Sequence, residues 1–162
     1  MGMTEAAGEG QAIRTGGAVS FATRLRSIQG LSSELVARLA DHGIADNATL
    51  LDRAARPEAR EALCAATGLD QVELLQALYM MDLERVDGVS WISARLLTAA
   101  GVTTVPDLAF RNPDDLLPQL QRANAELGLV KRLPSARVLK GWIDHARSLP
   151  QVIFFGGNGE VY

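Results

Sequence analysis

The chain has 162 residues, a net charge of −3 and a single cysteine, and 48% of its residues are hydrophobic. This length and composition predict one packed globular domain or two small ones, and one cysteine excludes both an internal disulfide framework and a multi-cysteine zinc site. Because no apolar run approaches the roughly 20 residues of a membrane span and no apolar signal segment begins the chain, we expect a cytoplasmic protein without membrane contact.

The charge is unevenly distributed along the chain. Residues 1–30 carry a net charge of +1, residues 31–129 carry −7, residues 130–149 carry +4 and the last thirteen residues carry −1. An acidic middle is therefore followed by a basic final helix. Such runs are typical of solvated helix faces, and the acidic middle offers little attraction for nucleic acid.

The chain divides by composition into an arm, a helical body and a tail. Residues 1–20 are rich in glycine, alanine and polar residues, which predicts a flexible N-terminal arm. Residues 21–150 show apolar positions at helical spacing, interrupted by Gly, Asp, Asn or Pro, so this body is predicted to be all-α. The expected helices are 21–28, 32–42, 47–55, 57–66, 70–80, 90–100, 105–111, 113–125 and 135–148.

Residues 151–162 break the helical pattern. A β-branched and aromatic run at 152–155 is followed by a glycine-rich turn, which predicts a short β-hairpin-like tail. A lone hairpin is marginally stable in water, so the tail needs a surface to lie against, either the chain's own N-terminal arm or a partner protein. The predicted partner-binding residues of the tail are Val152, Ile153, Phe154, Phe155 and Tyr162.

An internal repeat organises the helical body. The segments Ile28–Ser32 and Val86–Ser90 share the pattern apolar-x-Gly-apolar-Ser and lie 58 residues apart. This spacing predicts two packed copies of one helical unit, at residues 21–80 and 81–150. Further matches at the same offset pair Leu39 with Leu97, Gly43 with Gly101, Ile44 with Val102, Leu50 with Leu108, and Arg53 with Arg111.

The repeated motif has a clear physical purpose. Gly30 and Gly88 are placed where one helix must reverse into the next, a position that favours a positive φ. Ser32 and Ser90 stand where a helix N-cap is needed.

Two longer segments carry a family resemblance. SIQGLSSELVARLADHGI and RVDGVSWISARLLTAAGV resemble helix-hairpin-helix motifs. Together with TLLDRAARPEAREALCAATGL, the DLERVDGV junction and PDLAFRNPDDL, they are similar to the DUF4332 group of tandem helix-hairpin-helix domains, a group of unknown function. The resemblance covers about residues 25–148 and implies a fold more than an activity.

The helix-hairpin-helix resemblance also implies an alternative function, sequence-independent nucleic-acid binding. In such motifs a Gly-apolar-Gly hairpin holds a phosphate on its backbone amides. Here serine replaces the second glycine and can cap those amides itself, while Asp87 precedes the second hairpin and repels phosphate. The candidate nucleic-acid-binding residues are Gly30, Leu31, Ser32, Gly88, Val89, Ser90, Arg24, Arg26, Lys131, Arg132, Arg137 and Lys140.

The remaining conspicuous residues have structural interpretations. Trp91 either packs against the first repeat or forms an exposed anchor for a partner. His42, His145 and Cys64 show no catalytic or metal-ligand spacing, so no catalytic residue, cofactor or metal site is expected. The sequence therefore predicts a non-enzymatic helical adaptor or structural component that binds a protein partner or assembly, and it leaves the oligomeric state open.

Overall fold

The computed structural model describes residues 22–156, and within this range the chain is helical. No strand forms among these residues, and an isolated antiparallel bridge joins Arg24 and Asp46. The all-α prediction is thus confirmed for the described part of the chain. The elements are η1 (Leu25–Ser27), α1 (Ser33–Asp41), α2 (Asn47–Arg53), α3 (Pro57–Thr67), α4 (Gln71–Leu83), α5 (Trp91–Ala99), α6 (Val105–Ala109), α7 (Pro113–Leu127) and α8 (Ala136–Ser148).

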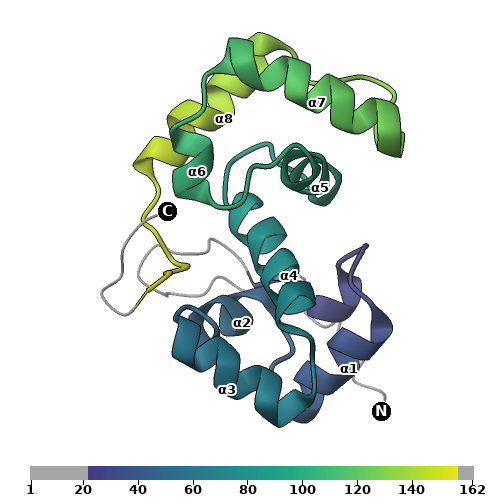
Figure 1. Cartoon of the computed structure of the whole chain (residues 1–162), viewed down its shortest axis with the longest axis vertical. Helices are drawn as coiled ribbons and strands as arrows, with labels where there is room; N and C mark the ends of the chain where they lie inside the picture. The colour runs from purple at the N-terminus through teal and green to yellow at the C-terminus, as the bar shows by residue number, and fades with distance from the viewer. Residues whose placement is uncertain (1–21, 157–162) are drawn as a thin grey trace, which may run out of the picture.

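The helices form two groups that share one helix. Figure 1 shows η1 to α3 at one end of the molecule and α5 to α8 at the other, with α4 running between them. Met81 of α4 belongs to the first hydrophobic cluster, and Leu83, two residues further on, belongs to the second. Because α4 contributes to both cores, the two groups are parts of one compact body.

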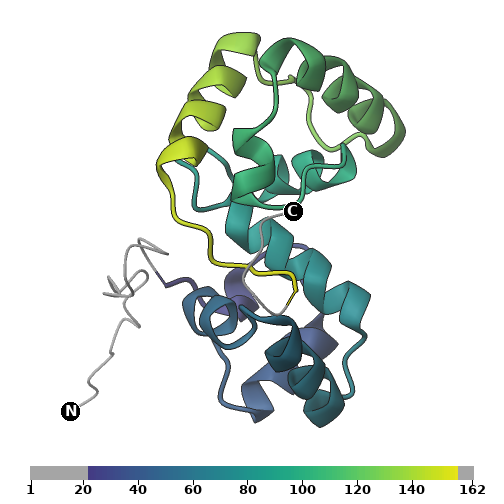
Figure 2. The same ribbon diagram turned by 60° about the vertical axis from the view of Figure 1, so that its left-hand side comes forward.

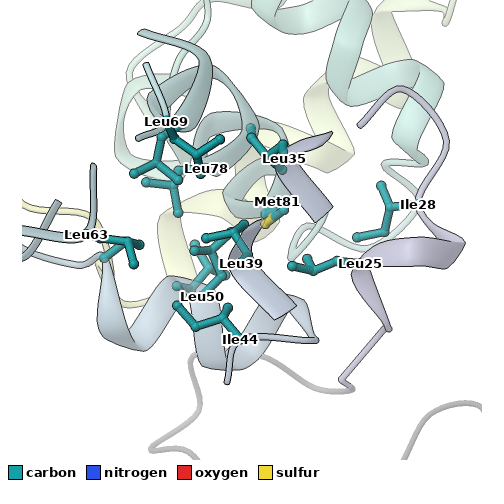
Figure 3. Close-up of a cluster of buried hydrophobic side chains, with 14 of the residues drawn as sticks. Leu25, Ile28, Leu35, Leu39, Ile44, Leu50, Leu63, Leu69, Leu78 and Met81 are labelled. Carbon is teal, nitrogen blue, oxygen red and sulfur yellow. The ribbon is translucent and has the colours of Figure 1, made fainter. Parts of the chain in front are cut away.

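Leucine side chains from successive helices fill the first core. Leu35 and Leu39 point from α1, Leu50 from α2 and Leu78 from α4, and each is at most 1% exposed (Figure 3). Burying a leucine side chain of this size stabilises a fold by about 1.5–3 kcal/mol.

The second core repeats this arrangement with different helices. Leu97 of α5, Leu108 of α6, Leu120 of α7 and Leu139 of α8 are all fully buried. The hydrophobic positions that the sequence spaces at helical intervals are therefore the ones that close the two cores.

Positions 58 residues apart adopt the same local conformation. Gly30 and Gly88 have φ angles of 92° and 86°, a region that glycine enters without strain. Ser32 accepts a hydrogen bond from the backbone of Leu35, and Ser90 does the same for Ser93, so both serines are helix N-caps.

An arginine also recurs at this offset with the same task. Arg53 donates to the carbonyl of His42 over 2.9 Å, and Arg111 donates to the carbonyl of Gly101 over 2.9 Å. In each half, an arginine at or just after the end of the shorter helix thereby satisfies a carbonyl left free where the preceding helix ends.

The start of the chain's helical body differs from the expected helix at 21–28. Only the single turn η1 forms within the described part of this range, because the flanking backbone pairs with the loop before α2. The N–H of Thr23 donates to Asn47 Oδ1 at 2.8 Å, and the N–H of Leu25 donates to the carbonyl of Ala45 at 2.9 Å. Those amides are therefore not available to a longer helix.

The described part of the tail, residues 151–156, lies against the first group of helices. Residues 151–156 form no strand and run back from α8 to the first group of helices, as the yellow segment in Figure 2 shows. Ile153 is 1% exposed and belongs to the first core. The predicted turn and return run at 157–162, with Tyr162, and the predicted arm at 1–20 lie outside the described residues.

Candidate functional site

The first hairpin candidate, Gly30-Leu31-Ser32, links η1 to α1 and has a carboxylate beside it. The Ser32 hydroxyl accepts from the N–H of Leu35 at 3.1 Å and donates to Glu73 Oε1 at 2.9 Å. The Glu73 side chain therefore places negative charge next to the helix N-terminus where a phosphate would need to bind. Coulomb repulsion from that carboxylate opposes phosphate binding.

A tryptophan from the other half of the molecule lies on this hairpin. A Cβ placed on Gly30 would stand only 2.5 Å from Trp91 Nε1, so only a glycine fits beneath the indole. Trp91 is half-buried and packs against the first core, and its buried Nε1 has no hydrogen-bond partner among the described residues. Of the two interpretations of Trp91, the structure thus shows packing against the first half.

The second hairpin candidate, Gly88-Val89-Ser90, is contacted on one side by α8. A Cβ on Gly88 would stand 3.1 Å from Trp142 Nε1, and the N–H of Asp87 donates to His145 Nδ1 at 2.9 Å. One face of the hairpin and the backbone amide before it are thereby committed to contacts inside the protein.

The arginine nearest to the second hairpin is also committed. Arg85 donates to Asp82 Oδ1 at 2.6 Å and to the carbonyl of Pro150 at 2.6 Å. Asp82 is fully buried and its other oxygen accepts from the N–H of Val105 at 2.7 Å, so the pair joins α4, α6 and the start of the tail. This guanidinium is held within the fold rather than presented at the hairpin.

The other predicted nucleic-acid-binding cations lie on the surface. Arg24 and Arg26 are exposed around η1, and Lys131, Arg132 and Arg137 are exposed before and at the start of α8. Elsewhere on α8, Lys140 and Arg147 both pair with Asp144, at 2.7 and 3.4 Å. Three exposed cations, Lys131, Arg132 and Arg137, thus lie close together in the sequence before and at the start of α8.

The tail residues predicted to bind a partner contact the chain's own first half. The N–H of Phe154 donates to the carbonyl of Ala55 at 2.8 Å, and Arg60 donates to the Phe154 carbonyl at 2.7 Å. The guanidinium of Arg56 lies 4.7 Å from the Phe154 ring centre and that of Arg60 lies 5.4 Å from the Phe155 ring centre, both within cation–π range.

This packing corrects the role expected for Ile153. Its side chain is buried in the first core, so it is not available as an exposed anchor. Val152 and Phe155 are half-buried against the same core, and the Phe155 ring centre lies 6.3 Å from that of Tyr79. The apolar run stabilises the fold because the Ile153 side chain completes the packing of the first core.

A groove opens where the two halves meet, near the C-terminal end of α4. Its volume is about 510 Å³, within the range of small-ligand pockets. Sequence reasoning did not single it out, because its walls come from three separate parts of the chain. The lining residues are Thr23, Asn47, Met81, Glu84, Arg85, Val86, Asp87, Gly88, Val89 and Ser90.

Two polar side chains in this groove have unused hydrogen-bonding capacity. Asn47 is 7% exposed, and its Oδ1 accepts from the N–H groups of Thr23 and Ala48, while its Nδ2 has no partner among residues 22–156. The carboxyl of Glu84 likewise has no hydrogen bond or ion pair within that range. Burial raises the pKa of Glu84 to about 7.

Of the residues considered for chemistry in the sequence, His145 accepts the hydrogen bond from the Asp87 N–H, and Cys64 lies in the first core. Cys64 is buried in the first core, and burial raises the pKa of its thiol. Within residues 22–156, no three or more His, Cys, Asp or Glu side chains gather in a way that could hold a metal ion. None of the helices in that range is long and apolar enough to cross a membrane.

Comparison with known proteins gives a family but no characterised relative. Neither the curated proteins nor the solved structures contain a match to this chain. The family model described as "Domain of unknown function (DUF4332)" matches residues 29–149, which span α1 to α8 and both hairpin candidates. The chain therefore belongs to the DUF4332 family.

Proposed function

We propose that this protein is a non-enzymatic helical adaptor, built from two helix-hairpin-helix-like repeats, that binds a protein partner. The positive-φ glycine, the serine cap and the arginine at or just after the end of α2 and α6 recur at one offset, which supports the duplication. Residues 21–80 and 81–150 are the two copies, and α4 contributes side chains to the core of each.

The observation that carries the proposal is the use of the hairpin glycines for internal packing. Trp91 contacts one side of Gly30, and Trp142 contacts one side of Gly88. Carboxylates of Glu73 and Asp87 stand beside the two hairpins, so repulsion would oppose phosphate at each. Hairpins of this kind are better suited to joining helices than to holding a nucleic-acid backbone.

Nucleic-acid binding stays as the second candidate because of the basic surface at the start of α8. Lys131, Arg132 and Arg137 are exposed and have no partner among the described residues. Three such cations could neutralise phosphates without using either hairpin, and binding of that kind would weaken steeply with salt.

Affinity capture with the whole chain separates the two candidates. The immobilised protein is incubated with cell extract, and the same capture is repeated after nuclease treatment of the extract. The adaptor proposal predicts protein partners that bind stoichiometrically and are retained after nuclease. Loss of every captured protein on nuclease treatment, together with capture of nucleic acid, would overturn it.

The charge-reversed variant Lys131→Glu/Arg132→Glu/Arg137→Glu is the matched control. These side chains are exposed, so the substitutions leave the core intact. The adaptor proposal predicts that protein capture survives in this variant, whereas nucleic-acid binding through the basic surface predicts that all capture is lost.

A further inference from the structure

We propose that the surface of the first half on which the tail lies is a docking site for an extended apolar segment of a partner protein, and that the chain's own tail occupies this site in cis. The segment that fits carries a branched aliphatic residue followed by two aromatic residues, as residues 153–155 do. The proposal rests on the adaptor function, because it names the kind of segment that the partner supplies. We call this surface the tail site, and its residues are Ala54, Ala55, Arg56, Arg60 and Tyr79.

The family domain supplies the tail site but not the tail. The family model matches residues 29–149, which include every residue of the tail site, whereas residues 150–156 lie outside the match. The last helix also ends at Ser148, before the tail begins. The domain therefore presents a surface that a segment from outside the domain fills, and another chain can supply such a segment as well as this chain does.

The tail site pairs the backbone of an extended segment. Arg60 donates to the carbonyls of Ala54 and Ala55 at 2.9 and 3.0 Å, and to the carbonyl of Phe154 at 2.7 Å. The Ala55 carbonyl also accepts from the N–H of Phe154 at 2.8 Å. Both backbone groups of one tail residue are thus paired by the tail site. Main-chain hydrogen bonds of this kind give affinity for an extended peptide whatever its side chains.

Three consecutive side chains of the segment provide the selectivity. Ile153 is 1% exposed and fills the first core, so this position selects a branched aliphatic residue. The two rings that follow lie over guanidinium groups, at 4.7 Å from Arg56 and 5.4 Å from Arg60, which favours aromatic residues. The second ring also lies 6.3 Å from the ring of Tyr79. The expected recognition pattern is therefore aliphatic-aromatic-aromatic.

The tail is held by contacts that can open while the helices stay folded. Residues 151–156 form no helix or strand, and Ile153 is the one residue among them that is buried. A terminal segment of this kind opens at a lower free energy than the helices of the core. Because a tethered segment acts at an effective concentration of about 1 mM, the tail competes with a partner segment and sets the affinity that the partner must exceed.

The test uses a fluorescein-labelled hexapeptide with the sequence of residues 151–156 as the probe, and the same peptide with serine in place of isoleucine as the matched ligand. Binding to the full-length protein is followed by fluorescence anisotropy. The full-length Ile153→Ala variant, whose own tail is weakened, should bind the probe with a dissociation constant of about 10–100 µM. The wild type should bind the probe about tenfold more weakly, and the serine peptide should bind the variant about tenfold more weakly than the probe does.

NMR shows whether the probe takes the place of the tail. The unlabelled hexapeptide is added at about 1 mM or more to the ¹⁵N-labelled wild type, a concentration that matches the tethered tail. The backbone N–H signal of Phe154 should move to the position of an unpaired amide, because the probe now uses the Ala55 carbonyl. This measurement needs no variant, so it decides the question even if Ile153→Ala does not fold.

Arginine variants locate the site. In the Ile153→Ala chain, Arg60→Gln should weaken probe binding about tenfold, whereas Arg122→Gln, at an exposed arginine of α7, should leave it unchanged. Absence of probe binding with an unmoved Phe154 signal, equal binding of the serine peptide, or equal effects of the two arginine variants would overturn the proposal. A dimer of the wild type that the probe dissociates would assign the site to the tail of a second copy and would also overturn it. None of these measurements uses cell extract, so their failure would leave the protein-capture result and the adaptor function to be judged separately.

Discussion

Substituting Gly30 by alanine tests directly whether the first hairpin is a packing site for Trp91. The backbone φ of 92° makes any side chain unfavourable there, at a cost of about 1–2 kcal/mol. The added Cβ would also lie 2.5 Å from Trp91 Nε1, so the indole has to move by close to 1 Å. Overpacking of this kind costs about a further 1–3 kcal/mol, and Gly30→Ala should therefore destabilise the fold by about 2–5 kcal/mol in total.

Gly101 is the matched control for this experiment. Its φ of 93° is nearly the same, but a Cβ there would meet no atom within 4 Å, so Gly101→Ala should cost only the backbone strain of about 1–2 kcal/mol. Both variants are measured by urea unfolding, followed by circular dichroism. Replacing Trp91 by leucine should remove the extra cost of Gly30→Ala in the double variant. Equal destabilisation by the two glycine substitutions, or no coupling between Gly30 and Trp91, would refute the proposed contact.

Three further predictions follow from the tail and from the junction of the halves. Ile153→Ala removes a side chain that is 1% exposed and should lower the free energy of unfolding by about 2–4 kcal/mol in urea titrations. The control Val72→Ala, at a residue that is 61% exposed, should change this free energy by less than about 0.5 kcal/mol. An equally small effect of both substitutions would place Ile153 outside the core. Asp82→Asn removes the carboxylate that pairs with the buried Arg85 guanidinium and should cost about 3–5 kcal/mol, and a loss below 1 kcal/mol would contradict a buried ion pair. Burial raises the pKa of Glu84 from 4.5 to about 7, so the contribution of its protonated form to stability is fully present below pH 4.5 and is lost as the pH rises through 7. At pH 8 the Glu84→Gln variant should therefore be more stable than the wild type by about 1 kcal/mol, after allowance for partial exposure of the side chain. A stability difference that does not shrink towards pH 5 would contradict this.

The sequence predicted most of the helical body because its signals are local. Helical spacing of leucines located α1 to α8, and Ser32 and Ser90 cap the helices that follow them. The burial of Ile153 could not be predicted, because its strong β propensity is a local signal and only the three-dimensional arrangement shows that the first core has a place for this side chain.

The candidate site could be predicted only in part, since its contacts join distant segments. Nothing in the local pattern indicated that Trp91 would lie on Gly30, or that His145 would accept from Asp87. Asn47 and Glu84 are 37 residues apart and resemble ordinary helix-end polar residues until the fold places both in one groove.

The most direct test of the central claim is whether the hairpins hold phosphate. Fluorescence anisotropy of a labelled DNA duplex and a labelled single strand is measured at 50 and 150 mM salt, with the wild type and with the Lys131→Glu/Arg132→Glu/Arg137→Glu variant. If the hairpin glycines are packing sites, as their contacts with Trp91 and Trp142 indicate, the variant shows no binding and any weak binding by the wild type disappears at the higher salt concentration. Binding that persists in the variant, and that is lost on substitution of Gly30 or Gly88 in a protein that stays folded, would contradict the account.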